Sequence, residues 1–391
     1  MSHLMNTYAR QSITFSHGEG AWLWGIDGKR YLDALSGIAV NTLGHAHPKL
    51  TAALSAQIGK LIHTSNLYQI REQELIADKL CELSQMQEVF FCNSGCEANE
   101  AAIKIARLYG NQRGIDTPTI IVMERAFHGR TLATLSATGN RKVQAGFEPL
   151  VKGFVRVPYD DLEAIRLVAL HTPNIVAVLV EPIQGEGGIR TPDISYLQDL
   201  RKICDEHEWL LMLDEVQCGL GRTGKWFAFQ HTDIMPDVMT LAKGLGSGVP
   251  IGACLTAGKA TGTFKPGNHG STFGGNPLAS TAALTTLNIM EQDQLLAHAE
   301  QLGAWIKQQL QTRLGGLQGV VTVRGQGLMI GVELDRACGV LVGQALEKGL
   351  LINVTVDSVI RLLPPLVFSE AEAQQMLDIL CPLVTEFLAQ E

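Results

Sequence analysis

Apolar residues in the middle of the chain form short, nearly continuous runs that alternate with longer amphipathic stretches. The runs are 88–92, 119–123, 175–180, 210–213 and 238–241. Near-continuous apolar strands separated by helical segments predict a mainly parallel sheet with helices on both faces. The helix expected over 97–109 follows its strand closely and carries its small and aliphatic residues on one face.

The segments on either side have different patterns. Asp27-Gly28 is a hairpin turn signal among the short β-rich runs of residues 20–50. After residue 275 one long helical stretch is expected over 277–313, followed by β-rich runs. A last helix should open at Ser369, where a glutamate three residues later completes a capping box.

Together these patterns predict an α/β protein with a large domain and a smaller α+β domain. The chain of 391 residues is long enough for both. We expect residues 1–50 to form an N-terminal segment that joins the small domain. Residues 51–274 should form the large domain with the mainly parallel sheet, and 275–391 the C-terminal small domain.

Composition excludes several function classes. Apolar residues make up 46% of the chain, the net charge is −8 and no basic stripe is present, so no nucleic-acid partner is expected. No apolar run is long enough to span a bilayer and no secretory segment is visible, which predicts a cytoplasmic protein without a membrane partner. The eight cysteines form no CxxC pair, which predicts reduced thiols. His45 and His47 favour structural hydrogen bonds, so we expect no metal site.

Polar residues gather directly after the apolar runs, where ligands bind in open parallel sheets. Ser94, Gly95 and Cys96 follow the first run and open a helix. Free backbone N–H groups and the helix dipole favour a phosphate at that point. Taken alone, the same residues favour an ordinary helix cap that binds no ligand.

Two further residues are suited to cofactor chemistry. Asp214 ends a buried run and is followed by Glu215, Val216 and Gln217. A buried acid needs a partner, either a magnesium ion beside a nucleotide or a protonated pyridine nitrogen. The chain lacks the GxxxxGK[ST] loop that the nucleotide alternative requires. Lys243 opens a Gly-rich loop, and it fits either a surface lysine or a Schiff-base lysine activated by desolvation.

Other strand ends and Gly-rich loops supply candidate contacts to a ligand. These candidates are Phe127, Arg130, Glu186, Ser271, Thr272 and Arg361. An aromatic ring can stack on a planar cofactor, and an arginine can bind a carboxylate through two hydrogen bonds. Each residue on its own is also compatible with simple packing or a solvated surface.

In this order, the segments resemble the class III aminotransferases, a family of pyridoxal-phosphate (PLP) enzymes of fold type I. The resemblance covers nearly the whole chain. It rests above all on LMLDEVQCGLGRTG at 211–224, LAKGLGSG at 241–248 and HGSTFGGNP at 269–277. It implies PLP as the cofactor, amino acids and 2-oxo acids as substrates, and a homodimer with active sites at the subunit interface.

The resemblance also implies catalytic and ring-binding roles. Lys243 would hold the cofactor as a Schiff base and then move a proton between the substrate and cofactor carbons. Asp214 would keep the pyridine nitrogen protonated. Phe127 and Val216 would sandwich the ring, and Gln217 would bond to its phenolic oxygen.

The remaining cofactor contacts come from three segments. Ser94, Gly95 and Cys96 would hold the phosphate, with Cys96 standing where the family often has threonine. Thr272 would reach the phosphate of the cofactor in the neighbouring subunit. Glu215, next to the pyridine-binding acid, belongs to the same expected set.

Within the family, the segments at 36–48 and 126–139 resemble the acetylornithine aminotransferase subgroup. The expected reaction moves the δ-amino group of N2-acetyl-L-ornithine to 2-oxoglutarate, a step of arginine biosynthesis. Arg130 would bind the α-carboxylate of the amine, and Ser271 would also contact substrate.

Arg361 and Glu186 offer a way for one site to take two substrates. When the terminal amine reacts, Glu186 would pair with Arg361 and hide its charge. When glutamate enters, Arg361 would release Glu186 and bind the α-carboxylate.

Several alternatives stay open at this point. Ornithine, succinylornithine, succinyl-diaminopimelate and 4-aminobutyrate are other possible amines. Ornithine enzymes carry a tyrosine where Ile38 stands, and the apolar Ile38 suits an acylated amine better. An aminomutase or racemase of the same fold, a PLP-binding protein without turnover and a nucleotide-binding enzyme are the other classes. Lys243, Asp214 and Arg361 together argue against a mere binding protein, which needs no carbanion sink.

Overall fold

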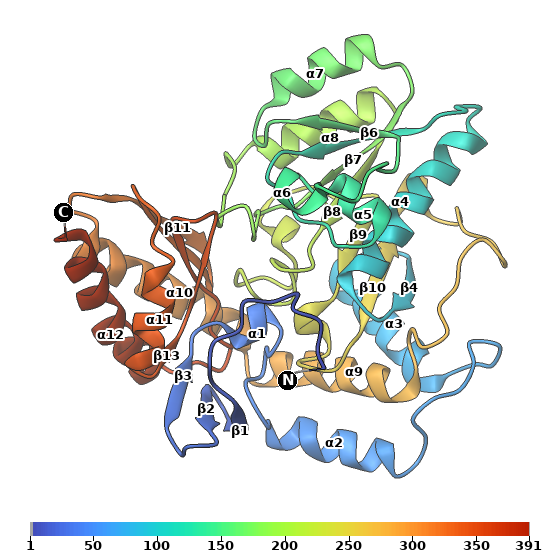
Figure 1. The fold of residues 1–391 in the computed structure, drawn as a ribbon. Coiled ribbons are helices and arrows are strands. Elements are labelled where there is room, and N and C mark those ends of the chain that lie inside the picture. Colours follow the sequence, from blue (N-terminus) through green and yellow to red (C-terminus); the bar gives the residue numbers. More distant parts are fainter. Residues whose placement is uncertain (1–2, 391) are drawn as a thin grey trace.

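A seven-stranded sheet forms the centre of the larger part of the molecule (Figure 1). The structure is a computed structural model and describes residues 3–390. Across the sheet the strands are β4 (Glu88–Cys92), β10 (Gly252–Thr256), β9 (Val238–Leu241), β8 (Leu210–Asp214), β7 (Ile175–Val180), β5 (Thr119–Met123) and β6 (Phe154–Val157). All five predicted apolar runs are strands of this sheet, so the predicted α/β fold is confirmed.

Strand direction determines where the polar residues gather. β6, β5, β7, β8 and β9 pair in parallel, whereas β10 is antiparallel to both β9 and β4. Because two antiparallel pairings follow each other, β4 runs in the same direction as β9. The carboxyl ends of these strands therefore meet at one edge of the sheet, where α/β proteins bind ligands.

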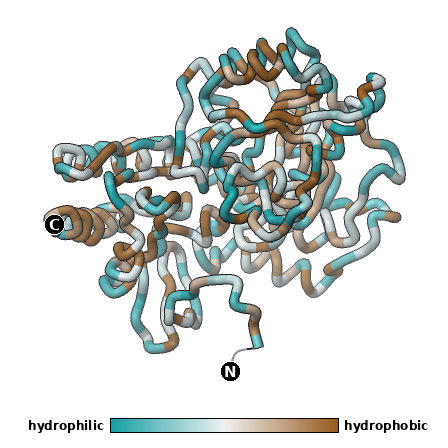
Figure 2. Tube along the Cα trace, turned by 45° about the horizontal axis from the view of Figure 1, so that its top comes forward, coloured by the Kyte–Doolittle hydropathy of each residue, from teal (hydrophilic) through white to brown (hydrophobic). Residues whose placement is uncertain are grey.

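Helices cover both faces of this sheet. The helices of this part are α1 (Ser36–Ala39), α2 (Pro48–Ile58), α3 (Arg71–Ser84), α4 (Gly95–Gln112), α5 (Leu132–Ala137), α6 (Arg141–Gln144), α7 (Leu162–His171), α8 (Tyr196–Glu206) and α9 (Pro277–Gln292). α4 packs on β7, β9 and β10 through small and aliphatic residues, as predicted, because alanines let the helix approach the sheet closely. α8 packs on β8, and α7 packs on α8. In Figure 2 hydrophobic segments concentrate between these layers, and the outer loops are mostly hydrophilic.

The smaller part of the molecule contains two four-stranded sheets. One consists of β1 (Phe15–Glu19), β2 (Trp22–Gly25), β3 (Arg30–Asp33) and β13 (Leu350–Leu351), and the other of β11 (Val320–Gln326), β12 (Met329–Leu334), β15 (Val359–Leu362) and β14 (Asn353–Thr355). The parallel pair of β3 with β13 joins the N-terminal hairpin to the C-terminal third of the chain. The predicted division of the chain at residues 50 and 274 stays a prediction.

Three helices accompany these sheets: α10 (Leu295–Leu314), α11 (Val340–Glu347) and α12 (Glu370–Leu388). The capping box predicted at Ser369 is present, with hydrogen bonds in both directions to Glu372. The single helical stretch predicted over 277–313 is wrong. The chain breaks between α9 and α10, where Gln294 has a left-handed φ of 53°. No glycine or proline marks this break, so the local pattern gave no signal for it.

No described helix is long and apolar enough to cross a membrane. The three strands at the centre of the sheet, β9, β8 and β7, are short and are buried along their whole lengths. Their apolar residues therefore form the core, and the first polar residue after each strand lies at the ligand-binding edge.

Candidate active site

The strand ends surround a cavity of about 320 Å³. Predicted residues in its wall are Ser94, Gly95, Cys96, Phe127, Glu186, Asp214, Val216, Gln217 and Lys243. These residues come from the ends of five strands, β4, β5, β7, β8 and β9, and from the loops that follow them. The structure thus brings together nine of the predicted site residues.

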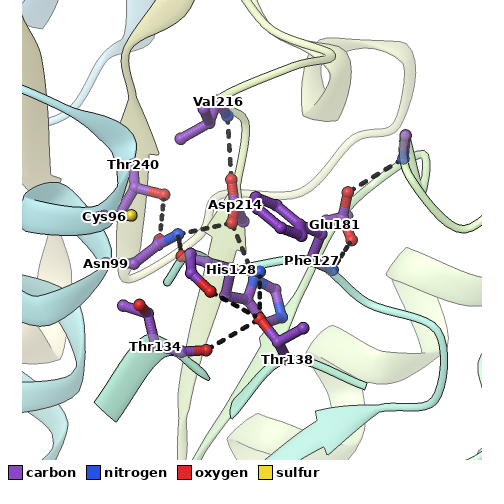
Figure 3. A network of polar contacts seen from close by, with 12 residues as sticks. Cys96, Asn99, Phe127, His128, Thr134, Thr138, Glu181, Asp214, Val216 and Thr240 are labelled. Atoms are coloured by element: carbon purple, nitrogen blue, oxygen red, sulfur yellow. Dashed lines mark hydrogen bonds and ion pairs between the residues drawn. The ribbon is translucent and has the colours of Figure 1, made fainter. Parts of the chain in front are cut away.

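Asp214 is the most elaborately supported of these side chains (Figure 3). Its side chain is almost completely buried at the end of β8. One carboxylate oxygen, Oδ2, accepts hydrogen bonds from Asn99 Nδ2 at 2.7 Å and from His128 Nδ1 at 2.8 Å. The other, Oδ1, accepts from the Val216 N–H at 3.1 Å. Three donors stabilise negative charge on this buried carboxylate.

The donors to Asp214 are themselves held in place. The Thr240 hydroxyl donates to Asn99 Oδ1 at 2.8 Å, and Asn99 Nδ2 also donates to the His128 carbonyl at 2.8 Å. The His128 N–H donates to Thr138 Oγ1 at 3.0 Å. These contacts fix the side chain of Asn99 and the backbone of His128, which supports the orientation of the Asp214 carboxylate.

A second buried acid, Glu181, lies at the end of β7 and also lines the cavity. Its carboxylate accepts from the Phe127 N–H at 2.9 Å and from the Gly185 N–H at 3.0 Å. Burial raises the pKa of Glu181 to about 7, against the influence of nearby His128. Because Glu181 bonds the backbone of Phe127, it sets the position of the aromatic ring at the cavity wall.

Lys243 follows β9 and is the lysine in the cavity wall. No described residue lies within hydrogen-bonding or ion-pair distance of its amine. Desolvation lowers the pKa of this amine, although the carboxylates of Glu186 and Asp214 oppose the change. The residue also has a left-handed φ of 38°, a conformation that is costly for any residue except glycine and is concentrated at functional sites.

The N-terminus of α4 forms another part of the wall. Ser94 caps the helix by accepting a hydrogen bond from the Glu97 N–H at 3.2 Å. The N–H groups of Gly95 and Cys96 belong to the first turn, so they have no partner within the helix. A Cβ atom added to Gly95 would lie only 2.8 Å from Val216 Cγ1, so only glycine allows the helix to approach Val216 this closely.

Arg361 lies behind the cavity and is fully buried in β15. Its Nη1 donates to Glu186 Oε1 at 2.6 Å and to Gln217 Oε1 at 3.3 Å. Its Nε donates to Asn353 Oδ1 at 3.0 Å, whereas Nη2 is buried without a partner among the described residues. The predicted pairing of Glu186 with Arg361 is thus the arrangement in this structure.

Besides Arg361, four predicted residues do not line this cavity. Arg130 lines a neighbouring, more polar cavity and lies 5.8 Å from the centre of the Phe127 ring. Ser271 and Thr272 lie in a surface loop; Ser271 Oγ accepts from Asn93 Nδ2 at 3.3 Å, and Thr272 is exposed. Glu215 points away from the cavity and accepts from the N–H groups of residues 228 and 229, which favours a structural role over cofactor contact.

Sequence reasoning did not single out four polar residues of the site. They are Asn99, His128, Glu181 and Thr240. The first three lie within or next to segments in which other residues were predicted to contact a ligand. In the sequence they are visible only as polar residues near a strand end or on the buried face of a helix. Such a position does not reveal which residue each side chain contacts.

The family model described as Aminotransferase class-III matches residues 5–384. The chain belongs to the class-III aminotransferase family. Its relatives include the acetylornithine aminotransferase of Nitrosomonas europaea, 63% identical over 99% of each chain. Another is acetylornithine aminotransferase 1 of Bordetella bronchiseptica, 56% identical over 100% of this chain and 99% of the relative.

Solved structures of other aminotransferases have the same fold as this class-III aminotransferase. An ornithine aminotransferase from Toxoplasma gondii superposes with a TM-score of 0.95 at 34% identity, covering 100% of this chain and 94% of that one. The acetylornithine aminotransferase from Elizabethkingia anophelis superposes with a TM-score of 0.87, also at 34% identity, covering 98% and 97%. The predicted family and fold are therefore confirmed.

The substitution Glu215→Gln tests how the buried carboxyl group beside Asp214 affects the free energy of unfolding as the pH changes. Burial raises the pKa of Glu215 from 4.5 to about 7, so the folded protein holds this proton more tightly than the unfolded chain. The free energy of unfolding should therefore fall as the pH rises from about 4.5 to about 7. Urea unfolding across this range should show a smaller fall for the variant. The control Glu206→Gln changes an exposed acid and should behave like the wild type. If Glu215→Gln showed the same fall as these two proteins, the raised pKa of Glu215 would be contradicted.

Proposed function

We propose that this class-III aminotransferase moves the δ-amino group of N2-acetyl-L-ornithine to 2-oxoglutarate, giving N-acetylglutamate 5-semialdehyde and glutamate. The observation that carries the proposal is the 63% identity, over nearly the whole of both chains, to an acetylornithine aminotransferase. The reaction needs an amine-binding cofactor, a proton-transferring base and a site that accepts both substrates in turn.

The cavity fits PLP as the cofactor. A lysine amine without a partner, a buried carboxylate and the free N–H groups of a helix N-terminus face the same space of about 320 Å³. These groups match the aldehyde, the pyridine nitrogen and the phosphate of PLP respectively. When bound, PLP supplies a carbonyl group that condenses with amines and a ring that accepts electrons from the substrate carbon.

Lys243 and Asp214 are the proposed catalytic residues. Lys243 Nζ would hold the cofactor and, after the substrate amine replaces it, would take and return a proton at the reacting carbon. The lowered pKa of Lys243 makes the neutral, nucleophilic amine easier to reach. Asp214 would accept a hydrogen bond from the protonated pyridine nitrogen, and Asn99 and His128 would hold its carboxylate for that contact.

The other cofactor contacts follow from the wall of the cavity. Phe127 and Val216 would enclose the ring. Gln217 already accepts from Arg361 through Oε1, so its Nε2 is free to donate to the phenolic oxygen. Ser94 and the first-turn N–H groups of Gly95 and Cys96 would hold the phosphate.

We propose that the Glu186–Arg361 pair exchanges partners between the two half-reactions. With the pair closed, the site would offer no free cation to the terminal amine, and Arg130 would bind the α-carboxylate of the substrate. With Glu186 displaced, Arg361 would bind the α-carboxylate of glutamate or 2-oxoglutarate through two hydrogen bonds. The unpartnered Nη2 of Arg361 supports this proposal, because it is a donor ready for such a ligand. Ser271 would add a substrate contact.

A homodimer would complete the site. Exposed apolar side chains cluster beside the loop that carries Thr272: Leu61, Ile62, Leu67, Tyr68 and Phe273. Asn66 ties the two segments together through hydrogen bonds to the carbonyls of Ser271 and Gly274. A second copy covering this patch would bring Thr272 towards the phosphate in its partner. Sedimentation at micromolar concentration should give a dimer, and a monomer would refute this.

We also propose a cytoplasmic location. All eight cysteines are free in the structure, and six of them are buried. A protein that works with reduced thiols suits a reducing compartment. Cell fractionation would test the location, and recovery with secreted proteins would contradict it.

Lys243→Ala should abolish both the yellow colour and the turnover of the PLP-loaded protein. The wild type should absorb visible light because its lysine is bonded to the cofactor, and the variant has no amine to form that bond. The matched control Lys202→Ala, on the surface of α8, should stay yellow and active. A colourless wild type that PLP does not reconstitute would contradict the cofactor assignment.

The amine substrate is tested by single-turnover bleaching of the PLP form. We expect N-acetylornithine to bleach the visible band faster than ornithine, succinyl-diaminopimelate or 4-aminobutyrate. The apolar Ile38 packs beside an apolar cluster and offers no hydrogen bond to a free α-amino group. A clear preference for ornithine or 4-aminobutyrate would overturn the substrate proposal.

Arg361→Ala should slow the two half-reactions unequally. The glutamate half-reaction should lose about 2–5 kcal/mol of binding free energy, because a buried charged hydrogen-bond donor is removed. The acetylornithine half-reaction should change far less, since that substrate does not use Arg361. Stopped-flow measurement of each half-reaction decides the matter, and equal losses would rule out the exchange of partners.

A further inference from the structure

Glu186 stands between two cavities. The first is the cavity with Lys243 and Asp214, and the second is a neighbouring space of about 540 Å³ that we call the vestibule. Among residues 3–390, only Glu186 and Phe127 belong to the walls of both. The Glu186 carboxylate is therefore next to the active site on one side and next to the vestibule on the other.

The vestibule is strongly cationic, although the whole chain carries a net charge of −8. Its charged wall residues are Arg125, Arg130, Arg141, Lys142, Glu186 and Asp357. Lys142 lies 3.7 Å from Asp357, and both of these side chains are largely exposed. Among the described residues, Arg125, Arg130 and Arg141 form no ion pair. Three unpaired guanidinium groups around one space favour an anion there.

The backbone around Glu186 is fixed by hydrogen bonds, whereas its carboxylate is held by the ion pair with Arg361. The Thr355 hydroxyl donates to the Glu186 carbonyl at 2.5 Å, and this loop is closed by the paired backbone of Gln184 and Arg190. The Glu186 side chain is nonetheless 35% exposed. Because this side chain lines both cavities, a change of rotamer would carry the carboxylate from one cavity towards the other without moving the backbone.

Arg361, by contrast, has one position. It is fully buried, and Asn353 holds its Nε at 3.0 Å independently of Glu186. When Glu186 leaves, the guanidinium keeps its orientation, with Nη1 and Nη2 available to a ligand. The exchange of partners thus requires only the acid to move.

We infer that Glu186 has a second binding position, in the vestibule, where Arg125 and Arg141 hold its carboxylate once a dicarboxylate has taken Arg361. The inference rests on the proposed function, since it explains how the same site admits 2-oxoglutarate. Without these two arginines, a displaced Glu186 would exchange its ion pair with the buried Arg361 for water and for the exposed Arg130 and Lys142. With them, the lost pair is partly replaced, so the arginines shift the equilibrium towards the state that binds dicarboxylates.

The two substrates differ in their dependence on the second position of Glu186. N-acetylornithine binds while Glu186 stays on Arg361, so it does not use the second position. A dicarboxylate requires the displaced state and so depends on the stability of that state. Arg125 and Arg141 would therefore act as positioning residues that set the affinity for 2-oxoglutarate without contacting it.

A double-mutant cycle on the PLP-loaded protein tests this inference. In Arg125→Gln/Arg141→Gln, we expect the KM for 2-oxoglutarate and the Kd for the unreactive dicarboxylate glutarate each to rise about fivefold, as for loss of a partly exposed ion pair. The KM for N-acetylornithine should not change. The same double substitution made in Glu186→Gln should change none of the three constants, because no carboxylate is left to hold.

The control is Arg166→Gln/Arg336→Gln, which removes the same charge from two surface arginines paired with Glu163 and Asp335. It should leave all three constants as in the wild type. An equal rise in the Glu186→Gln background would overturn the inference, because the arginines would then act on the incoming dicarboxylate itself. A wild type that transfers no amino group would refute the proposed function, while glutarate binding would still decide whether Glu186 has a second position.

Discussion

A carboxylate buried at the end of a central strand is the constraint on which the site depends. An ionised acid in an apolar interior is tolerated only when donors surround it. Asp214 receives three, and two of them, Asn99 and His128, come from elements that follow other strands. The three hydrogen bonds to the Asp214 carboxylate therefore hold α4, the loop after β5 and the loop after β8 in fixed positions relative to each other.

The smaller part of the molecule is attached through buried arginines. Arg361 reaches from β15 to Glu186 and Gln217 on the loops of the large sheet. Arg222 extends from the loop after β8 of the large sheet to the smaller part, where it donates to the carbonyls of Leu328 and Pro364. Burial lowers the pKa of Arg222 to about 9, which shows the cost of desolvating its charge. Because both arginines contact or belong to the segment 361–364, Arg361 is held by the same contacts that join the two parts.

The local pattern predicted the strands and the family segments well, and it failed where tertiary contacts override it. β10 is a short strand of mostly small residues that pairs with β4 on one side and β9 on the other, and this pairing is not visible in its local pattern. The break at Gln294 arises where α9 lies on α2 and α3 while α10 turns towards α12. Glu215 follows Asp214 directly, yet its carboxylate bonds to the backbone of residues 228 and 229, away from the cavity.

The sequence by itself determined most of the strands, the polar residues at their ends and the family, because periodicity, caps and glycine loops are local properties of the chain. It therefore named Lys243, Asp214 and Arg361 before any contact was known. Only the tertiary structure decided which groups surround them. Asn99 lies 115 residues from Asp214, and Glu186 lies 175 residues from Arg361. Such contacts depend on strand order and packing, which no local pattern encodes.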